Sequence, residues 1–176
     1  MIITGDNLSG IHELNDFLIQ NFEMKDLGYL SYFLGLEITS SDDGFYLTQA
    51  KYTFDLLSQA SLTNHKIVNT PFELNAHLTP SSGELFLDPT LYRQLVGNLV
   101  YFIVTHLDVS YVVHQVSQFM STPRSTHYAT VLHILQYLKD TLFHGLHFSA
   151  QSLLTLRAYS DADWVRDPTN RRSTTG

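Results

Sequence analysis

The sequence predicts an α+β protein, and three observations lead to this prediction. The 176 residues are 44% hydrophobic and only 15% charged, which is typical of a packed globular chain. Two strand-like segments flank the turn-forming residues 40–44. Residues 88–142 repeat apolar side chains at helical spacing. We therefore expect an early β-hairpin, a following helical bundle and further strands near residue 176.

Several secondary-structure elements are predicted within residues 1–61, before a linker. The β-branched pair Ile2-Ile3 is followed at once by turn residues and indicates the end of a strand without a partner before it. Apolar side chains then recur about every 3.6 residues and predict a helix. The predicted elements are a strand end at 2–3, a helix at about 9–21, hairpin strands at 32–39 and 45–49, and a helix at about 50–61.

Residues 62–87 have little periodicity and contain Thr70-Pro71 and Thr79-Pro80, as expected for a linker. Asp88 and Pro89 then form a strong helix start, because Asp caps free N–H groups and Pro fits the first turn. Two more helices are predicted to begin at Asp108 and after Pro123, and the three form a bundle. Their predicted core comprises Leu91, Leu95, Leu99, Phe102, Val109, Val112, Val113, Val116, Phe119, Met120, Val131, Leu132, Leu135 and Leu138.

The last predicted strands cover residues 145–148 and 153–164. Asp161 and Asp163 share one face of the second strand, because side chains alternate along it. Paired carboxylates suit Mg²⁺, which prefers oxygen ligands. The alternative is two solvated aspartates near a strand end. No phosphate-binding loop, dinucleotide motif or nucleophile elbow is present, so the residues do not predict a complete active site.

Charge and cysteine content exclude several classes of protein. With no cysteine, disulfides, iron–sulfur clusters and thiolate zinc sites are excluded, and His144 and His147 lack a third zinc ligand nearby. The net charge is −7, and residues 1–60 carry nine carboxylates against two lysines. Nucleic-acid affinity depends on Lys and Arg, so composition argues against an independent nucleic-acid-binding module. The longest apolar run, 99–104, predicts no membrane span, and without a signal pattern the default expectation is a cytoplasmic protein.

Several phrases occur in an order that resembles the copia-type retrotransposon Pol polyprotein, from the end of the reverse-transcriptase palm into RNase H. The resemblance covers essentially the whole chain. The phrases are FEMKDLG at 22–28, YFLGLEI at 32–38, LTQAKY at 47–52, YRQLVGNL at 92–99, YSDADW at 159–164 and RRSTTG at 171–176.

The resemblance implies a partial palm with a β-hairpin, a helical thumb/connection bundle and the first strands of an RNase H-like domain. The implied units are a palm remnant with the hairpin at 1–61, a linker at 62–87, the thumb/connection bundle at 88–142 and a truncated RNase H-like start at 143–176. One departure is His106-Leu107, where the family usually has Arg-Pro. The loss of an Arg beside a nucleic-acid channel weakens phosphate contact.

The family's activity is RNA-directed DNA polymerase with RNase H, which relies on Mg²⁺ held by aspartates. The polymerase motif Tyr-x-Asp-Asp is expected just before a segment like 2–5, and it is missing here. By resemblance, Asp161 matches the first metal-binding aspartate of RNase H, and the other metal-binding carboxylates are expected downstream of residue 176. Only the alternation of side chains along the strand supports Asp163 as a ligand. We therefore expect no tight metal binding and no activity of this chain alone.

Phe33, Leu34 and Gly35 resemble the hairpin that positions the primer end, where Gly permits close backbone approach. The alternative is an ordinary hairpin with a packing glycine. The implied partner is an RNA–DNA or DNA primer–template duplex, bound weakly or not at all by this chain alone. A different functional class stays open: a reused non-enzymatic fragment that binds protein or RNA–DNA duplex. Unpaired strands at 2–3 and 153–164 also predict self-association.

Overall fold

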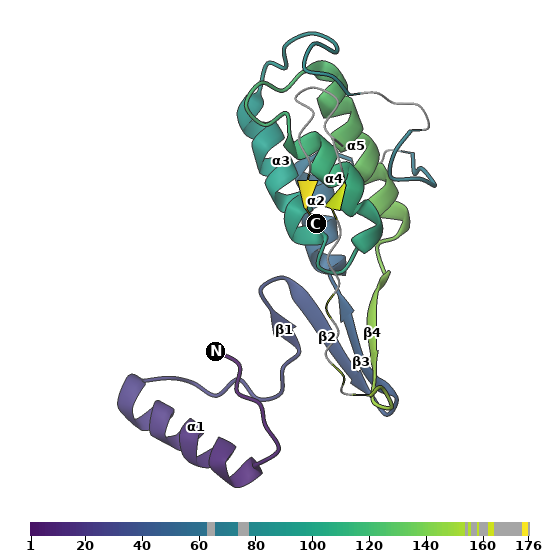
Figure 1. Ribbon diagram of the computed structural model, residues 1–176. Coiled ribbons are helices and arrows are strands. Elements are labelled where there is room, and N and C mark those ends of the chain that lie inside the picture. The colour runs from purple at the N-terminus through teal and green to yellow at the C-terminus, as the bar shows by residue number, and fades with distance from the viewer. Residues whose placement is uncertain are drawn as a thin grey trace.

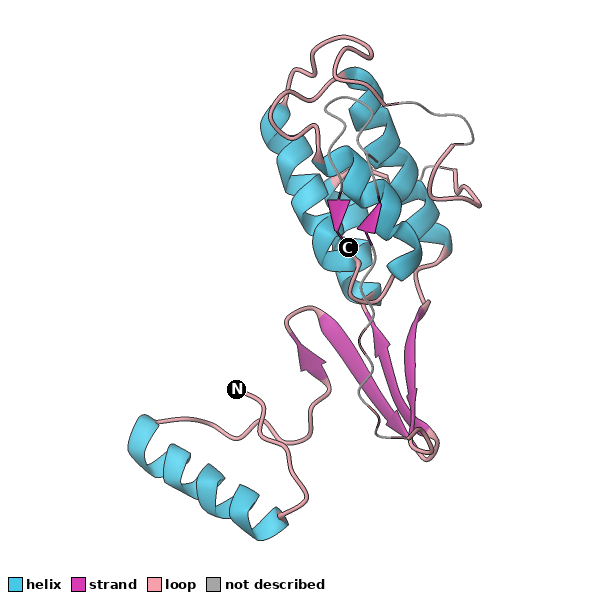
Figure 2. Cartoon of the chain, in the orientation of Figure 1, coloured by secondary structure: helices cyan, strands magenta, loops and turns pink. Residues whose placement is uncertain are grey.

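The computed structural model describes residues 1–62, 66–73, 78–153, 155, 158, 162–163 and 174–175. It confirms the α+β class, with α1 apart from the rest, an antiparallel sheet and a helical bundle beyond the sheet (Figure 1, Figure 2). The elements are α1 (Leu8–Phe22), β1 (Tyr32–Phe33), β2 (Leu36–Ser41), β3 (Gly44–Thr48), α2 (Ala50–Gln59), α3 (Pro89–Phe102), the 3₁₀ turn η1 (Leu107–Val109), α4 (Ser110–Ser117), α5 (Ser125–Asp140), β4 (Gly145–Ser149), β5 (Ala162–Asp163) and β6 (Thr174–Thr175).

The sheet is antiparallel, with the order β1-β2-β3-β4. Its first predicted strand, 32–39, is in fact two strands, because Leu34 and Gly35 form a turn that pairs Phe33 with Leu36. The predicted hairpin is the pair β2 and β3. Strand β4 then pairs with β3, with Gly44 opposite Ser149. The sheet thus joins two segments of the chain that the resemblance assigns to different units.

The core lies among α2, α3, α4 and α5 (Figure 1). Apolar side chains at helical spacing lie inside, and each fully buried one contributes about 1.5–3 kcal/mol. Helix α2 contributes Leu56 and Leu57 and packs against α5, so the bundle has one helix more than predicted. The fully buried apolar residues include Tyr92, Leu95, Val96, Leu99, Phe102, Val109, Val113, Val116, Val131, Ile134, Leu135 and Leu138. Among the predicted core residues, Leu91, Phe119, Met120 and Leu132 are only partly buried.

The described part of the predicted linker is packed against the start of α5. The Arg124 guanidinium donates to the carbonyls of Pro80 at 2.6 Å and Gly83 at 2.9 Å. The buried His127 ring accepts the Arg124 backbone N–H at Nδ1, 3.2 Å away, and donates from Nε2 to the Thr79 carbonyl at 3.0 Å. These bonds fix the loop to the bundle.

The N-terminal prediction of a strand is wrong, because Ile2 and Ile3 belong to no strand. Helix α1 buries none of its side chains. Most of the predicted strand 153–164 lies outside the described residues. Its described residues Ala162 and Asp163 form β5, which pairs with β6. Within the described residues, no helix combines the length and apolarity that a membrane crossing requires.

Candidate nucleic-acid interface

The turn between β1 and β2 has an unusual backbone. Leu34 has φ +49° and Gly35 has φ +83°, and positive φ at both central residues is the pattern of a type I′ hairpin turn. Glycine adopts this conformation freely, whereas a left-handed Leu costs about 1–2 kcal/mol. A strained residue of this kind is held by its surroundings and often belongs to a functional site.

Two tyrosines from the bundle hold the turn from behind. The Tyr101 hydroxyl, on α3, donates a hydrogen bond to the Leu34 carbonyl. A Cβ at Gly35 would lie 3.4 Å from the Tyr101 ring and 3.6 Å from the Tyr52 ring. The two rings pack edge to face at 5.4 Å. Burial, followed by the proximity of Tyr101, raises the pKa of Tyr52, so its hydroxyl stays neutral at physiological pH.

The other side of the turn faces outward. Because the peptide between Leu34 and Gly35 is trans, its N–H is opposed to its carbonyl. The carbonyl is fixed toward Tyr101, so the Gly35 N–H is directed away from α3. The Leu34 side chain is 70% exposed, and that of Phe33 is half-buried. The turn therefore presents a backbone donor and an apolar side chain.

A cation from α2 lies beside strand β1 of the sheet. The Lys51 ammonium sits 5.7 Å from the centroid of the Tyr32 ring, within cation–π range. Tyr32 is opposite Glu37 in the sheet. The Glu37 carboxylate accepts from the Thr48 hydroxyl at 3.3 Å and from the Lys51 backbone N–H at 3.4 Å. An exposed amide, an aromatic ring and an ammonium group are suited to a phosphate backbone and an unstacked base.

The sequence analysis named Phe33, Leu34 and Gly35, and they lie together at this turn. It did not identify Tyr52, Tyr101 or Lys51 as their neighbours. Helical spacing accounts for Tyr52 as an apolar position and leaves Tyr101 beside the core stripe. Nothing in the sequence relates Tyr101 to a turn that lies 67 residues earlier.

The predicted metal-binding aspartates, Asp161 and Asp163, are not among the described side chains. Asp161 is outside the described residues, and Asp163 lies in β5, of which only the backbone is described. In the part of the chain that the structure describes, no group of three or more His, Asp or Glu side chains could hold a metal ion. The assignment of Asp161 and Asp163 to Mg²⁺ stays a prediction.

A buried polar cluster joins the sheet to the bundle behind the turn. The Thr105 hydroxyl donates to Gln49 Oε1 at 2.5 Å and lies 2.9 Å from His106 Nδ1. On the other side of the ring, His106 Nε2 lies 3.5 Å from the Thr141 carbonyl. Burial lowers the pKa of His106. The cluster connects the start of α2 with the end of α3 and acts as a structural link.

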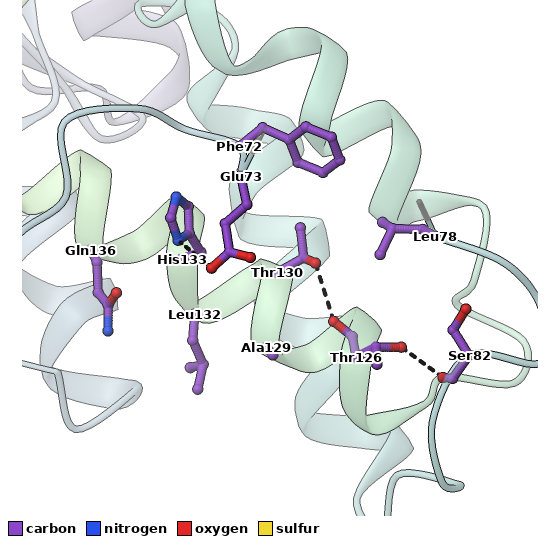
Figure 3. Close-up of a pocket in the computed structure, with 10 residues that line it drawn as sticks. All are labelled: Phe72, Glu73, Leu78, Ser82, Thr126, Ala129, Thr130, Leu132, His133 and Gln136. Carbon is purple, nitrogen blue, oxygen red and sulfur yellow. Dashed lines mark hydrogen bonds and ion pairs between the residues drawn. The ribbon is translucent and has the colours of Figure 1, made fainter. Parts of the chain in front are cut away.

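A cavity of about 480 Å³ lies between α5 and the loop that crosses it (Figure 3). Its polar centre is His133, whose Nδ1 lies 3.7 Å from Glu73 and whose Nε2 donates to the Thr70 carbonyl at 2.9 Å. Both ring nitrogens are thus already engaged. Residues 74–77, between the lining residues Glu73 and Leu78, lie outside the described residues. The β1–β2 turn is therefore the stronger candidate site.

Comparison of the sequence with known proteins identifies the family of the chain. Residues 1–74 match the model of the reverse transcriptase (RNA-dependent DNA polymerase) family. The whole chain is 40% identical over 176 residues to the Pol polyprotein of transposon RE1 from Arabidopsis thaliana, and 33% identical over 187 residues to that of transposon TNT 1-94 from Nicotiana tabacum. An uncharacterised mitochondrial protein of Arabidopsis thaliana is 36% identical over the whole chain, which covers 73% of that protein. This chain belongs to the copia-type retrotransposon Pol family.

The copia-type Pol chain described here spans 12% of the RE1 polyprotein and 14% of the TNT 1-94 polyprotein. No solved structure matches it. The β1–β2 turn lies within the part that matches the reverse transcriptase family, whereas Tyr101 lies beyond residue 74. The turn and its anchor are thus contributed by different parts of the retrotransposon chain.

Proposed function

We propose that this segment of a retrotransposon reverse transcriptase contacts the backbone of a primer–template duplex through the β1–β2 turn. One observation carries the proposal: the left-handed Leu34-Gly35 turn directs an amide donor outward. Phosphate contacts of this kind fix the register and orientation of a duplex without reading its sequence. The turn would thus position the primer end for a polymerase site elsewhere in the polyprotein.

The chemistry of the contact follows from the residues around the turn. The Gly35 N–H would donate to a phosphate oxygen, and Gly offers no side chain to obstruct the approach. Lys51 would neutralise a phosphate charge and release its counterion. The Tyr32 ring, beside Lys51, offers a face for stacking. The acidic balance of residues 1–60 opposes this contact, so we expect weak, local binding.

Catalysis by the 176 residues themselves is not part of this proposal. None of their tyrosines stands two residues before an Asp-Asp pair, and two-metal phosphoryl chemistry requires such carboxylates. We assign Asp161 to a residual RNase H position, with Asp163 as a weak second ligand, and residues 1–61, 88–142 and 143–176 to the palm, thumb/connection and RNase H-like units. In this assignment the purified chain neither extends a primer nor cleaves the RNA of a hybrid.

A second function is favoured by the short mitochondrial relative, of which this chain covers 73%. A segment of this size that recurs within a short protein is compatible with a reused, non-enzymatic role. Such a fragment would bind a protein or an RNA–DNA duplex. Duplex binding alone does not separate the two functions, whereas a protein partner that competes with duplex for the turn would favour reuse.

The test is a fluorescence anisotropy titration of the chain with a labelled RNA–DNA primer–template at two salt concentrations. The expected result is binding that weakens with salt, and Lys51→Gln should reduce the slope of log K against log salt by about 0.9, the value for one phosphate contact. Lys66→Gln is the matched control, because it removes one positive charge from the loop after α2. No binding at low salt, or equal slopes for the two variants, would overturn the proposal.

A further inference from the structure

The orientation of the Leu34–Gly35 peptide is not fixed by the hairpin itself. In a two-residue hairpin turn this central peptide makes no hydrogen bond to the opposite strand. Leu34 also has a left-handed conformation that its side chain disfavours. A rotation of the peptide would change ψ of Leu34 and φ of Gly35, and it would turn the Gly35 N–H away from its outward direction. A bond to the central carbonyl opposes this rotation.

Tyr101 supplies that bond from a rigid support. It lies on α3 directly before Phe102, which is fully buried, and its ring packs against Tyr52. A tyrosine has only two rotatable side-chain angles, so little conformational entropy is lost when the hydroxyl is fixed. The hydroxyl donates to the Leu34 carbonyl, and the ring edge lies behind Gly35. Tyr101 thus attaches the turn to a helix that is packed in the core of the bundle.

We propose that Tyr101 is a positioning residue, whose hydroxyl fixes the Leu34–Gly35 peptide so that the turn is preorganised for nucleic acid. The claim that Tyr101 fixes the peptide rests on the geometry alone. The claim that this fixing serves nucleic-acid binding rests on the proposed function. Tyr101 touches no substrate in this role, because it acts on the opposite side of the peptide. A helix of the bundle therefore controls the geometry of the duplex-facing sheet.

Tyr101→Phe tests the proposal, because it removes the hydroxyl and keeps the ring. We expect hydrogen–deuterium exchange of the Ile38 amide, which donates to the Ser31 carbonyl at 2.8 Å across the β1–β2 hairpin, to rise about five-fold, the factor for a hydrogen bond of about 1 kcal/mol, while exchange in α3 and α5 is unchanged. The affinity for the labelled primer–template should fall by a similar factor. Tyr46→Phe is the matched control: its hydroxyl donates to Asp43 at 2.9 Å in the same sheet, away from the turn.

The outcomes separate this inference from the function on which it rests. If the wild-type chain binds no duplex, the proposed function fails, and the exchange of the Ile38 amide alone decides whether Tyr101 fixes the turn. If the wild type binds and Tyr101→Phe changes neither exchange nor affinity, the positioning role is overturned. Faster exchange with unchanged affinity also overturns it, because the fixed peptide would then not serve binding. Equal losses in Tyr46→Phe would also overturn it, because a general weakening of the sheet would then account for both variants.

Discussion

Gly35 and Gly97 show how one amino acid has opposite consequences for stability at two places in this protein. Gly35 has φ +83° and lies against two aromatic rings, whereas Gly97 lies inside α3 with open space where a Cβ would be. The first position needs the conformational range of glycine. At the second, glycine only adds freedom to the unfolded chain.

Gly35→Ala and Gly97→Ala should therefore change the free energy of unfolding in opposite directions. We expect Gly35→Ala to lower it by about 1–2 kcal/mol, because an L side chain is strained at this φ. Gly97→Ala should raise it by about 0.5–1 kcal/mol, because Ala is favoured over Gly within a helix. Urea denaturation of the two variants measures both values, and a destabilised Gly97→Ala would contradict the prediction.

His127 should make the protein sensitive to acid. Burial lowers its folded-state pKa below the ordinary 6.5, and Nδ1 accepts the Arg124 N–H, which a protonated ring cannot do. The unfolded state thus binds the proton more readily, so stability is fully present above about pH 6.5 and decreases as pH falls below it. His127→Gln should flatten this dependence in urea denaturations between pH 8 and pH 5. A variant with the slope of the wild type would exclude His127 as the cause.

At the scale of elements, α1 and α3 begin with the same device and differ in what they pack against. Asn7 accepts the Gly10 N–H at 3.0 Å, and Asp88 accepts the Leu91 N–H at 2.9 Å. Helix α3 supplies Leu95, Leu99 and other core residues, whereas α1 buries none of its side chains. The same cap therefore stabilises a cooperative core in one case and only a local helix in the other.

Removing the two caps should separate global from local stability. Asp88→Ala should lower the free energy of unfolding by about 1 kcal/mol, the usual value of an N-cap. Asn7→Ala should leave that free energy unchanged and increase amide exchange only in α1. Denaturation and hydrogen exchange of the two variants provide the comparison. A global loss in Asn7→Ala would mean that α1 belongs to the cooperative unit.

The sequence was sufficient for elements whose signal is local. Asp88-Pro89 places the start of α3, and the spacing of Val109, Val112 and Val116 places the core-facing side of η1 and α4. It was insufficient wherever distant residues meet. The break at Leu34, the pairing of β4 with β3 and the bond from Tyr101 all depend on contacts across many residues, and no local pattern contains them.

At the scale of the whole molecule, the core lies within the helical bundle and leaves α1 outside. Figure 1 shows α1 set apart, joined to β1 by residues 23–31, which form no helix or strand. Apolar side chains on α1 are exposed, including Leu8 at 70% and Phe22 at 63%. Strands β1 and β4 are the edges of the four-stranded sheet, and edge strands can pair with another chain; the self-association predicted for residues 2–3 and 153–164 stays a prediction.

Limited proteolysis should cut first between α1 and β1. An exposed segment without secondary structure is the preferred site of cleavage, and residues 23–31 are exposed throughout. The larger product should keep the thermal midpoint of the intact chain, because α1 contributes no buried side chain. Mass spectrometry identifies the cut, and differential scanning fluorimetry compares the midpoints. A clearly lower midpoint would show that α1 contributes to the core.

The ladder between β3 and β4 has a consequence for the order in which the protein forms. It closes a loop of about 100 residues that contains the entire bundle, and closure of a long flexible loop has a high entropic cost. Once α2 through α5 have packed, the end of β3 and the start of β4 are already neighbours, and that cost has been met. Strand β4 should therefore be the last part to acquire protection in pulse-labelled hydrogen exchange during refolding. A nascent chain would complete its four-stranded sheet only after the bundle had emerged and folded.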